Sequence, residues 1–396
     1  MEYSGFARHF GNMTQVTRRL LLNLMAGAAV AQDTVKPVTP RPPRPIDAPI
    51  DVMVPVPPTP FRANGKSHLV YELHVTNLGR AESVLTRVEV VSQDQLLASY
   101  AGDGFAKTIS RPGVQAQDPL RIDGGLRAVI FIWVTLDAGV PSAIEHRIGL
   151  KVGDDEFETL CARTVVRKEA ISIRPPLRGD GWMAANGPAN LSGHRRALIP
   201  IGGSAHIAER FAIDWLQLDK NGQSYTGDRL DNKSYRCYGN ELFAVADGVV
   251  VAMKDGIPEN VPGATSRAVP ITLETVGGNH IMVDIGGGNF AFYAHAQPGK
   301  IRVRLGDRVK EGQVLGLLGN SGNSTEPHLH FHICDANSPL GSEGLPYRLT
   351  AFDVQGQGGI VRDPATNSAR FGWTPSNSTD RRTNEMPMQN VVVRFS

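Results

Sequence analysis

Short segments in which apolar and polar residues alternate run through most of this chain and limit what it can fold into. Examples are SVLTRVEVVS (83–92), AIEHRIGLKVG (143–153) and PHLHFHIC (327–334). Turn-forming residues separate such segments, and the 396 residues include 42 glycines and 27 prolines. Because successive side chains of a strand point to opposite faces, this pattern predicts half-buried strands joined by turns. Helical periodicity is nearly absent, so we expect an all-β protein.

Composition and charge exclude several classes of protein and partner. Hydrophobic residues make up 41% of the chain and charged residues 20%, which is ordinary for a globular protein. The formal net charge of +2 and the lack of a basic run argue against a nucleic-acid partner. Three cysteines are too few for a disulfide framework or a Cys-x-x-Cys zinc site. The sequence is compatible both with a Cys237–Cys334 disulfide and with buried free thiols.

The N-terminal residues have the pattern of an export signal. An Arg-Arg pair at 18–19 precedes an apolar run over 20–30, and a small-residue Ala-Val-Ala triplet ends at residue 31. The run is too short to span a bilayer and no second one follows, so we expect no membrane span. The arginine pair also resembles a twin-arginine signal, while a buried N-terminal helix is the alternative. We predict a signal peptide over 1–31, a proline-rich linker over 32–48, and a bacterial protein exported to the periplasm or beyond.

The rest of the chain divides into three regions. Residues 49–170 are predicted to form an immunoglobulin-like β-sandwich, because short strands follow one another between turn signals. Its polar residues are scattered, so we expect a spacer or binding role there. A Pro/Gly-rich segment then opens a second β-rich domain, which we place at 171–355. Residues 356–396 are polar, with one strand-like stretch, NVVVRF, and we predict that they form a C-terminal extension.

Three of the chain's 11 histidines alternate within five positions, at His328, His330 and His332. In a strand these three imidazoles share one face, and the apolar residues between them fill the other. A partly exposed strand would explain the pattern, and so would a metal or proton-transfer site. We favour the site, because neutral imidazole is a common metal ligand and titrates near neutral pH.

Two longer stretches around this row resemble a known family. GNELFAVADGVVV (239–251) and the run from GGNHIMVDIGGGNFAFYAHAQPG to NSTEPHLHF (277–331) are similar to the lysostaphin-type, or LytM-type, zinc metallopeptidases of metallopeptidase family 23. These enzymes cut peptide cross-bridges of bacterial peptidoglycan. The resemblance implies a glycine-hinged, barrel-sandwich-like β-domain built on a duplicated hybrid motif. It also implies Zn²⁺ as the cofactor and a peptidoglycan peptide as the substrate.

In that family, zinc is held by an HxxxD motif and by the second histidine of an HxH motif. The resemblance places the HxH ligand at His330 and the aspartate at Asp214. Position 210, where the family has its first histidine, is occupied by arginine. Arginine cannot bind zinc, because its guanidinium is always charged and has no lone pair to donate. If this segment is a strand, Arg210 and Asp214 share a face and both point into the site.

Two interpretations of Arg210 are open. One is a replacement ligand: a hairpin turning at 202–203 would pair residues whose numbers sum to about 405 and bring His194 opposite the arginine. His206 is a second local candidate, but along a straight strand it would lie roughly 26 Å from Asp214. We select His194 as the third ligand. The other interpretation is loss of the metal, with Arg210 forming an ion pair with Asp214.

Two further histidines correspond to the family's catalytic pair. They are His295, in the sequence Tyr-Ala-His, and His328. The resemblance implies that one takes a proton from a zinc-activated water and passes it to the leaving amine, while the other hydrogen-bonds the developing oxyanion. We therefore predict an exported zinc metalloendopeptidase that hydrolyses peptide cross-links of peptidoglycan.

Two rival functions use the same fold. A degenerate, metal-free module would bind the cell wall or activate a cell-wall amidase as its partner, and Arg210 is the residue that favours it. A sugar-transport phosphocarrier has a similar hybrid barrel and would use His280 or His295 together with His328. The export signal argues against the phosphocarrier, because that chemistry needs cytoplasmic phosphodonors.

Overall fold

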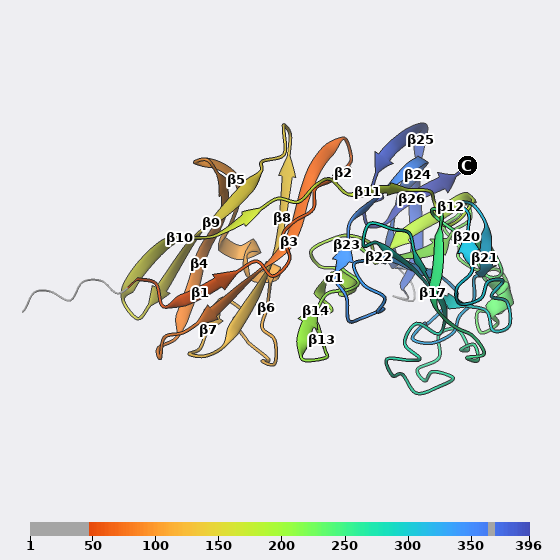
Figure 1. Ribbon diagram of the computed structural model, residues 1–396, viewed down its shortest axis with the longest axis horizontal. Coiled ribbons are helices and arrows are strands. Elements are labelled where there is room, and N and C mark those ends of the chain that lie inside the picture. The colour runs from red at the N-terminus through yellow and green to blue at the C-terminus, as the bar shows by residue number, and fades with distance from the viewer. Residues whose placement is uncertain (1–46, 363–368) are drawn as a thin grey trace, which may run out of the picture. The chain divides into compact units, whose positions relative to one another are not determined.

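The computed structural model describes residues 47–362 and 369–396, and this part of the chain is built almost entirely of strands (Figure 1). The expected all-β fold class is confirmed. The predicted signal peptide, and all but the end of the predicted linker, lie outside the described residues. Within the described residues, no helix is long and apolar enough to cross a membrane.

Two five-stranded antiparallel sheets form the N-terminal sandwich. The first sheet contains β1 (Ile50–Met53), β2 (Phe61–Ala63), β3 (Lys66–Asn77), β6 (Ile109–Ser110) and β8 (Arg127–Leu136). The second contains β4 (Ser83–Ser92), β5 (Gln95–Ala101), β7 (Arg121–Ile122), β9 (Ala143–Val152) and β10 (Asp155–Val165). Two 3₁₀ turns, η1 (Gly102–Gly104) and η2 (Ala106–Thr108), follow β5.

The alternating residues of these strands supply the sandwich core. Val88 and Val90 of β4 and Ile148 of β9 are fully buried in one hydrophobic cluster. Residues two apart point to the same face of a strand, so the sequence pattern is enough to place these side chains between the two sheets.

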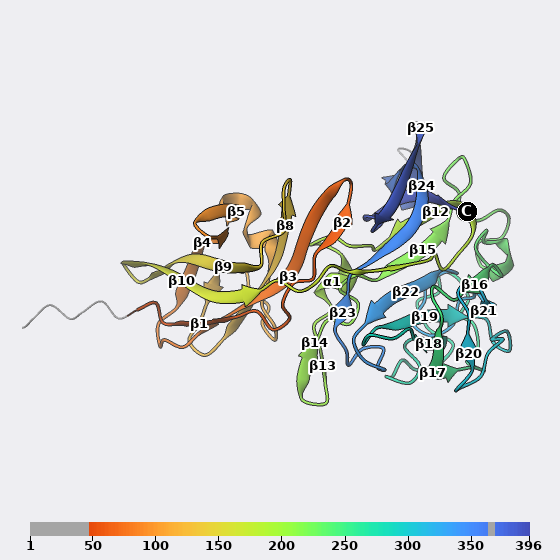
Figure 2. The same ribbon diagram turned by 45° about the horizontal axis from the view of Figure 1, so that its top comes forward.

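A 12-stranded sheet organises the rest of the chain, in the order β11-β24-β26-β12-β15-β22-β19-β18-β17-β20, with β23 paired to β22 and β25 to β24 (Figure 2). Its first strands are β11 (Ile171–Ile173), β12 (Gly179–Ala185), β15 (Ile213–Gln217), β17 (Gly248–Lys254), β18 (Asn279–Asp284) and β19 (Phe290–Ala296). The later strands are β20 (Arg308–Val309), β22 (Leu329–Cys334), β23 (Gly344–Leu345), β24 (Tyr347–Arg362), β25 (Ala369–Glu385) and β26 (Val391–Phe395).

Short elements connect these strands. They are the hairpin of β13 (Ile199–Ile201) and β14 (Ser204–His206), the pair β16 (Glu241–Phe243) and β21 (Val314–Leu317), the helix α1 (Gly193–Arg196) and the 3₁₀ turn η3 (Asn232–Ser234). In the β13–β14 hairpin, Ile199 pairs with His206 and Ile201 with Ser204. The predicted hairpin and its register are therefore confirmed. The pairing ends at Ile199 and His206, however, so His194 lies on α1 and not opposite Arg210 in a ladder, as we had expected.

The C-terminal region differs from the separate extension predicted for 356–396. Strand β24 crosses the boundary predicted at residue 355, and β26 lies between β12 and β24 in the large sheet. Val392 and Val393 of β26 are fully buried. The pairing of β26 with β12 joins segments about 200 residues apart, and sequence spacing alone carries no signal for such a contact.

The sandwich and the large sheet share a hydrophobic core. Phe61 of β2 meets Phe211 edge-on, with ring centroids 5.6 Å apart, and both belong to a cluster that also contains Trp215 and Phe331. Val129 and Phe131 of β8 pack with Ile207 in a second shared cluster. The sandwich is therefore packed directly against the second β-rich region, in part through Ile207 and Phe211.

All three cysteines are free thiols. Cys237 and Cys334 are buried, and the Cys237 thiol donates to the carbonyl oxygen of Pro327 at 3.0 Å. Of the two alternatives that the sequence allowed for this pair, the structure has the buried thiols.

Candidate metal centre

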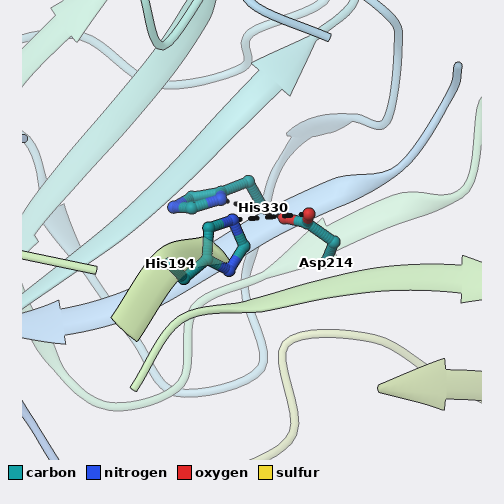
Figure 3. Close-up of side chains that lie close together, drawn as sticks. All are labelled: His194, Asp214 and His330. Carbon is teal, nitrogen blue, oxygen red and sulfur yellow. Dashed lines mark hydrogen bonds and ion pairs between the residues drawn. The ribbon is translucent and has the colours of Figure 1, made fainter. Parts of the chain in front are cut away.

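Three side chains from separate elements converge on one point: His194 of α1, Asp214 of β15 and His330 of β22 (Figure 3). Their ligand atoms all lie within 4.8 Å of one another. Strands β15 and β22 are antiparallel neighbours, and Asp214 is directly opposite His330 in their register. The sheet therefore brings a carboxylate and an imidazole together, and α1 adds the third donor.

Hydrogen bonds fix which nitrogen His194 offers. Its Nδ1 lies 3.0 Å from the backbone carbonyl oxygen of Asn186, so Nδ1 carries the proton and Nε2 keeps its lone pair. That Nε2 is 3.4 Å from Oδ2 of Asp214. The Asn186 side-chain amide donates to the same carboxylate oxygen at 2.8 Å. Such outer contacts orient the ligands of a metal ion.

Asp214 and His332 orient the His330 ring from its two nitrogens. Its Nδ1 lies 2.9 Å from Oδ1 of Asp214, and its Nε2 lies 3.0 Å from Nδ1 of His332. His332 is completely buried beside Phe292, with ring centroids 5.1 Å apart. His332 therefore packs inside the sheet, where its ring supports His330 from behind.

The donor set fits Zn²⁺. Two imidazole nitrogens and one carboxylate oxygen are a common three-residue set at catalytic zinc sites, which keep one position for water or substrate. Asp214 is only 9% exposed, yet its ion-pair partners are histidines. Burial acts to raise the pKa of Asp214, but the imidazoles of His194, His328 and His330 outweigh it and hold that pKa well below its usual value. A buried carboxylate of this kind suits a divalent cation.

His295 and His328 lie next to this set. Their ring centroids are 4.7 Å apart, and the His295 ring is 5.9 Å from that of His330. Nδ1 of His295 is 2.7 Å from the carbonyl oxygen of Ser321, and Nδ1 of His328 is 2.8 Å from that of Glu326. Each Nδ1 therefore carries a proton, and Nε2 is the atom left for chemistry. Nε2 of His328 lies 3.4 Å from Asp214.

The backbone at His295 has an uncommon conformation. Its φ of 67° lies in the left-handed region, which residues other than glycine and asparagine rarely adopt. The register between β18 and β19 shifts at this point, and the His295 amide donates to the carbonyl oxygen of Gly277 at 2.9 Å. This bulge turns His295 into the site, as irregular strand positions often do beside active sites.

The two histidines have different electrostatic surroundings. Burial lowers the pKa of His295 to well below its usual value, and the imidazoles of His328 and His330 lower it further. Burial also acts to lower the pKa of His328, but the Asp214 carboxylate outweighs it and the pKa is raised. Paired groups whose pKa values are pushed apart are typical of acid–base sites.

A cavity of about 300 Å³ opens over these residues. His194, Asp214, His295, His328 and His330 all line it, which are the five site residues selected from the sequence. Asn186, Glu209 and Arg267 also line the cavity, and the sequence analysis did not select them. None of them belongs to a short motif, so no local signal could have identified them.

The structure corrects our expectation for Arg210 and clarifies the position of His206. Residues 208–211 form turns before β15 begins, so Arg210 does not share a strand face with Asp214. Its guanidinium is buried and forms ion pairs with Glu72 at 2.9 Å and Glu343 at 2.7 Å. His206 lies beside the other oxygen of Glu343, at 3.1 Å.

Comparison with known proteins agrees with the geometry. Residues 234–341 match the protein family described as Peptidase family M23. This stretch is a peptidase family M23 domain. It includes His295, His328 and His330, whereas His194 and Asp214 precede the matched residues. The lysostaphin-type resemblance found in the sequence is confirmed.

Two curated relatives and one solved structure illustrate the similarity. Glycyl-glycine endopeptidase ALE-1 of Staphylococcus capitis is 37% identical over 122 residues, which cover 30% of this chain and 30% of ALE-1. Peptidoglycan DD-endopeptidase ShyA of Vibrio cholerae is 31% identical over 102 residues, which cover 26% of this chain and 19% of ShyA. The chain thus spans less than a third of either relative. The solved catalytic domain of lysostaphin from Staphylococcus simulans is 21% identical, with a TM-score of 0.23, and the alignment covers 42% of this chain and 88% of that one.

Proposed function

We propose that this protein is a zinc metalloendopeptidase that hydrolyses peptide cross-links of bacterial peptidoglycan. The observation that carries the proposal is the convergence of His194, Asp214 and His330, whose ligand atoms lie within 4.8 Å of one another in the same cavity as His295 and His328. The M23 domain supports a hydrolase, and the two curated relatives carry names of peptidoglycan or glycyl-glycine endopeptidases.

The proposed roles follow from the atoms that each residue leaves free. Nε2 of His194, a carboxylate oxygen of Asp214 and Nδ1 of His330 would hold the ion. Zn²⁺, when bound, lowers the pKa of a coordinated water to roughly 7 and polarises a carbonyl group. His295 and His328 share the other tasks through their Nε2 atoms. One accepts a proton from the attacking water and gives it to the leaving amine. The other donates a hydrogen bond to the developing oxyanion.

The metal-free alternative loses its main support. It rested on an arginine that would occupy the place of a ligand and pair with Asp214. Arg210 instead pairs with Glu72 and Glu343, and His194 supplies the third donor beside Asp214. A wall-binding or amidase-activating module is therefore not favoured by any contact around the described site.

The proposal also requires export, because peptidoglycan lies outside the cytoplasmic membrane. We propose that residues 1–31 direct it, as their arginine pair and apolar run suggest. Fusing residues 1–46 to a reporter that is active only after export tests this part separately. A reporter that stays inactive in the cytoplasm would contradict it.

The central test combines metal analysis with digestion of peptidoglycan. The full chain is expected to contain about one equivalent of zinc and to release cross-link fragments from sacculi, measured by chromatography of the products. Glycine-bridged and directly cross-linked sacculi should be compared, since the names of ALE-1 and ShyA refer to different bonds. His330→Ala is expected to abolish both zinc binding and cleavage. A folded full chain without zinc that leaves both kinds of sacculi intact would overturn the proposal.

A further inference from the structure

Helix α1 carries a metal ligand but cannot hold its own position. It has only four residues, Gly193–Arg196, and Ser192 before it makes no side-chain capping hydrogen bond. A helix this short is not stable without tertiary contacts. The position of His194 therefore depends on what the rest of α1 touches.

Arg195, the residue after His194, is completely buried and reaches into the sandwich. One end of its guanidinium is paired with the carboxylate of Glu72 on β3. The other end donates to the carbonyl oxygens of Tyr71 at 2.9 Å and Ile132 at 3.1 Å, which belong to β3 and β8. All three acceptors lie in one sheet of the sandwich, and Figure 2 shows α1 beside β3.

Neighbouring residues make further bonds to the same domain. Arg196 donates to the carbonyl oxygen of Lys107 and lies 3.3 Å from the Ser110 hydroxyl. The Asn190 amide donates to the carbonyl oxygen of Phe131 at 3.0 Å, and its own oxygen accepts from Nε of Arg195 at 3.1 Å. The Phe131 ring lies under both guanidinium groups, at 5.3 Å from that of Arg195 and 4.7 Å from that of Arg196. The segment around His194 is thus attached to the sandwich at several points.

The charges in this interface depend on one another. Glu72, only 2% exposed, is shared by Arg195 and Arg210, and Arg210 also pairs with Glu343 just before β23. Two buried cations are therefore balanced by two carboxylates, one of which comes from the sandwich. Buried charges persist only when they are paired in this way, so the interface favours one docked arrangement.

We propose that the N-terminal sandwich completes the metal centre, with Glu72 and the β3 and β8 carbonyls holding Arg195 so that His194 reaches Asp214 and His330. Arg195 is a positioning residue, because it acts on the metal only through His194. The inference rests on the proposed zinc site and adds to it a role for a domain that carries none of the ligands. Without this contact, the ladder between β15 and β22 would still hold Asp214 and His330, whereas His194 would keep only its hydrogen bond to Asn186.

Two arginine variants separate positioning from general stability. Arg195→Met removes the guanidinium from α1 and leaves Glu72 paired with Arg210. Arg210→Met is the matched control. Arg210 lies on a segment that does not carry His194, and its loss leaves Glu72 paired with Arg195. Zinc affinity of the full-length proteins is measured by calorimetry. The visible absorption of the Co²⁺-substituted proteins is the second readout, because it reports the number and geometry of the ligands.

Arg195→Met is expected to lower zinc affinity about 10- to 100-fold, the range typical for contacts that orient a metal ligand, and to weaken the absorption of tetrahedral Co²⁺. Arg210→Met should leave both close to those of the unaltered protein. If Arg195→Met does not fold, Asn190→Ala takes its place, since it removes one bond to Arg195 and one to Phe131 without exposing a buried charge. Asn190→Ala is expected to lower zinc affinity and the Co²⁺ absorption in the same direction, but by less.

The outcomes distinguish the two proposals. If the unaltered protein binds zinc and the Arg195 and Asn190 variants bind it equally well, the sandwich does not position His194 and the inference fails alone. Equal losses in Arg195→Met and Arg210→Met would also overturn it, because the loss would then follow from breaking the ion pair. If the unaltered protein binds no zinc, the proposed function itself fails.

Discussion

The nitrogen atoms that His194 and His330 offer to a metal are set by the hydrogen bonds on the far side of each ring. The Asn186 carbonyl oxygen takes the Nδ1 proton of His194, and His332 lies against Nε2 of His330. One histidine therefore presents Nε2 and the other Nδ1. At the residue scale, these contacts determine the chemistry of the site as much as the ligands themselves do.

A pair of histidine substitutions tests the third ligand. His194→Ala should reduce bound zinc from about one equivalent to near zero and abolish cleavage of peptidoglycan, because two donors rarely retain zinc. His206→Ala removes the other local histidine, which contacts Glu343 instead of Asp214, and should leave both properties unchanged. Metal analysis by mass spectrometry measures the difference. Equal zinc loss in both variants, or none in either, would contradict our choice of ligand.

A histidine of the sandwich makes folding sensitive to acid. His146 is fully buried, its Nε2 is 2.8 Å from the Tyr71 hydroxyl, and burial lowers its pKa to about 4 from an ordinary value of 6.5. The unfolded chain therefore binds a proton at higher pH than the folded one. The stability that His146 contributes is complete above pH 6.5 and is lost as the pH falls towards 4, by up to about 3 kcal/mol.

Urea denaturation of the unaltered protein and of His146→Gln at pH 7 and pH 4 measures this contribution. The unaltered protein should lose more free energy of unfolding between the two pH values than the variant does. Identical losses in the two proteins would show that His146 does not titrate with folding.

At the scale of elements, the site depends on an irregular strand. The bulge in β19 at His295 is packed against the loop before β22, where the Ser321 carbonyl oxygen receives the His295 proton. Gly278 at the other side has a φ of 59°, and a Cβ atom there would lie 2.5 Å from that carbonyl oxygen. The glycine is thus required both by its backbone conformation and by the close approach of Ser321.

Gly278→Ala should therefore displace Ser321 and with it His295. We expect a loss of about 1–3 kcal/mol in the free energy of unfolding, from overpacking, and a marked loss of peptidoglycan cleavage. Gly288→Ala is the matched control, because Gly288 also has a positive φ, 75°, but nothing lies within 4 Å of the added atom. It should cost only about 1 kcal/mol and leave activity intact. Equal effects on activity in both variants would exclude the steric explanation.

At the scale of the whole molecule, the sandwich and the M23 domain are connected through buried charges as well as apolar side chains. Arg210 joins them, since Glu72 belongs to β3 and Glu343 lies beside β23. Burial acts to raise the pKa of Glu72, but Arg210 and Arg195 outweigh it and the pKa is lowered. Glu72 is therefore charged in the folded protein and paired with both arginines.

Replacing Arg210 with histidine distinguishes a role as a zinc ligand from a structural role. Arg210→His should not add a zinc equivalent, and it should cost about 3–5 kcal/mol in the free energy of unfolding, because it leaves buried carboxylates partly unpaired. Arg302→His breaks an exposed ion pair with Glu241 and should cost at most about 1 kcal/mol. Zinc content and urea denaturation measure both effects. Additional zinc in Arg210→His would mean that this side chain faces the metal site after all.

The sequence by itself determined the strands and the histidine row. Alternation is a local property, so the pattern around His330 was enough to place Leu329, Phe331 and Ile333 in the core and the imidazoles on the opposite face. The β13–β14 hairpin was equally local, because a two-glycine turn fixes its register.

Only the tertiary structure decided where Arg210 points and how α1 is held. Whether a side chain four residues before Asp214 faces the site depends on where β15 begins, and a buried Glu72 from a distant strand binds that arginine. The same carboxylate holds Arg195, 123 residues away in sequence. Contacts of this range depend on how the sandwich packs onto the chain, and no periodicity or spacing in the sequence encodes that packing.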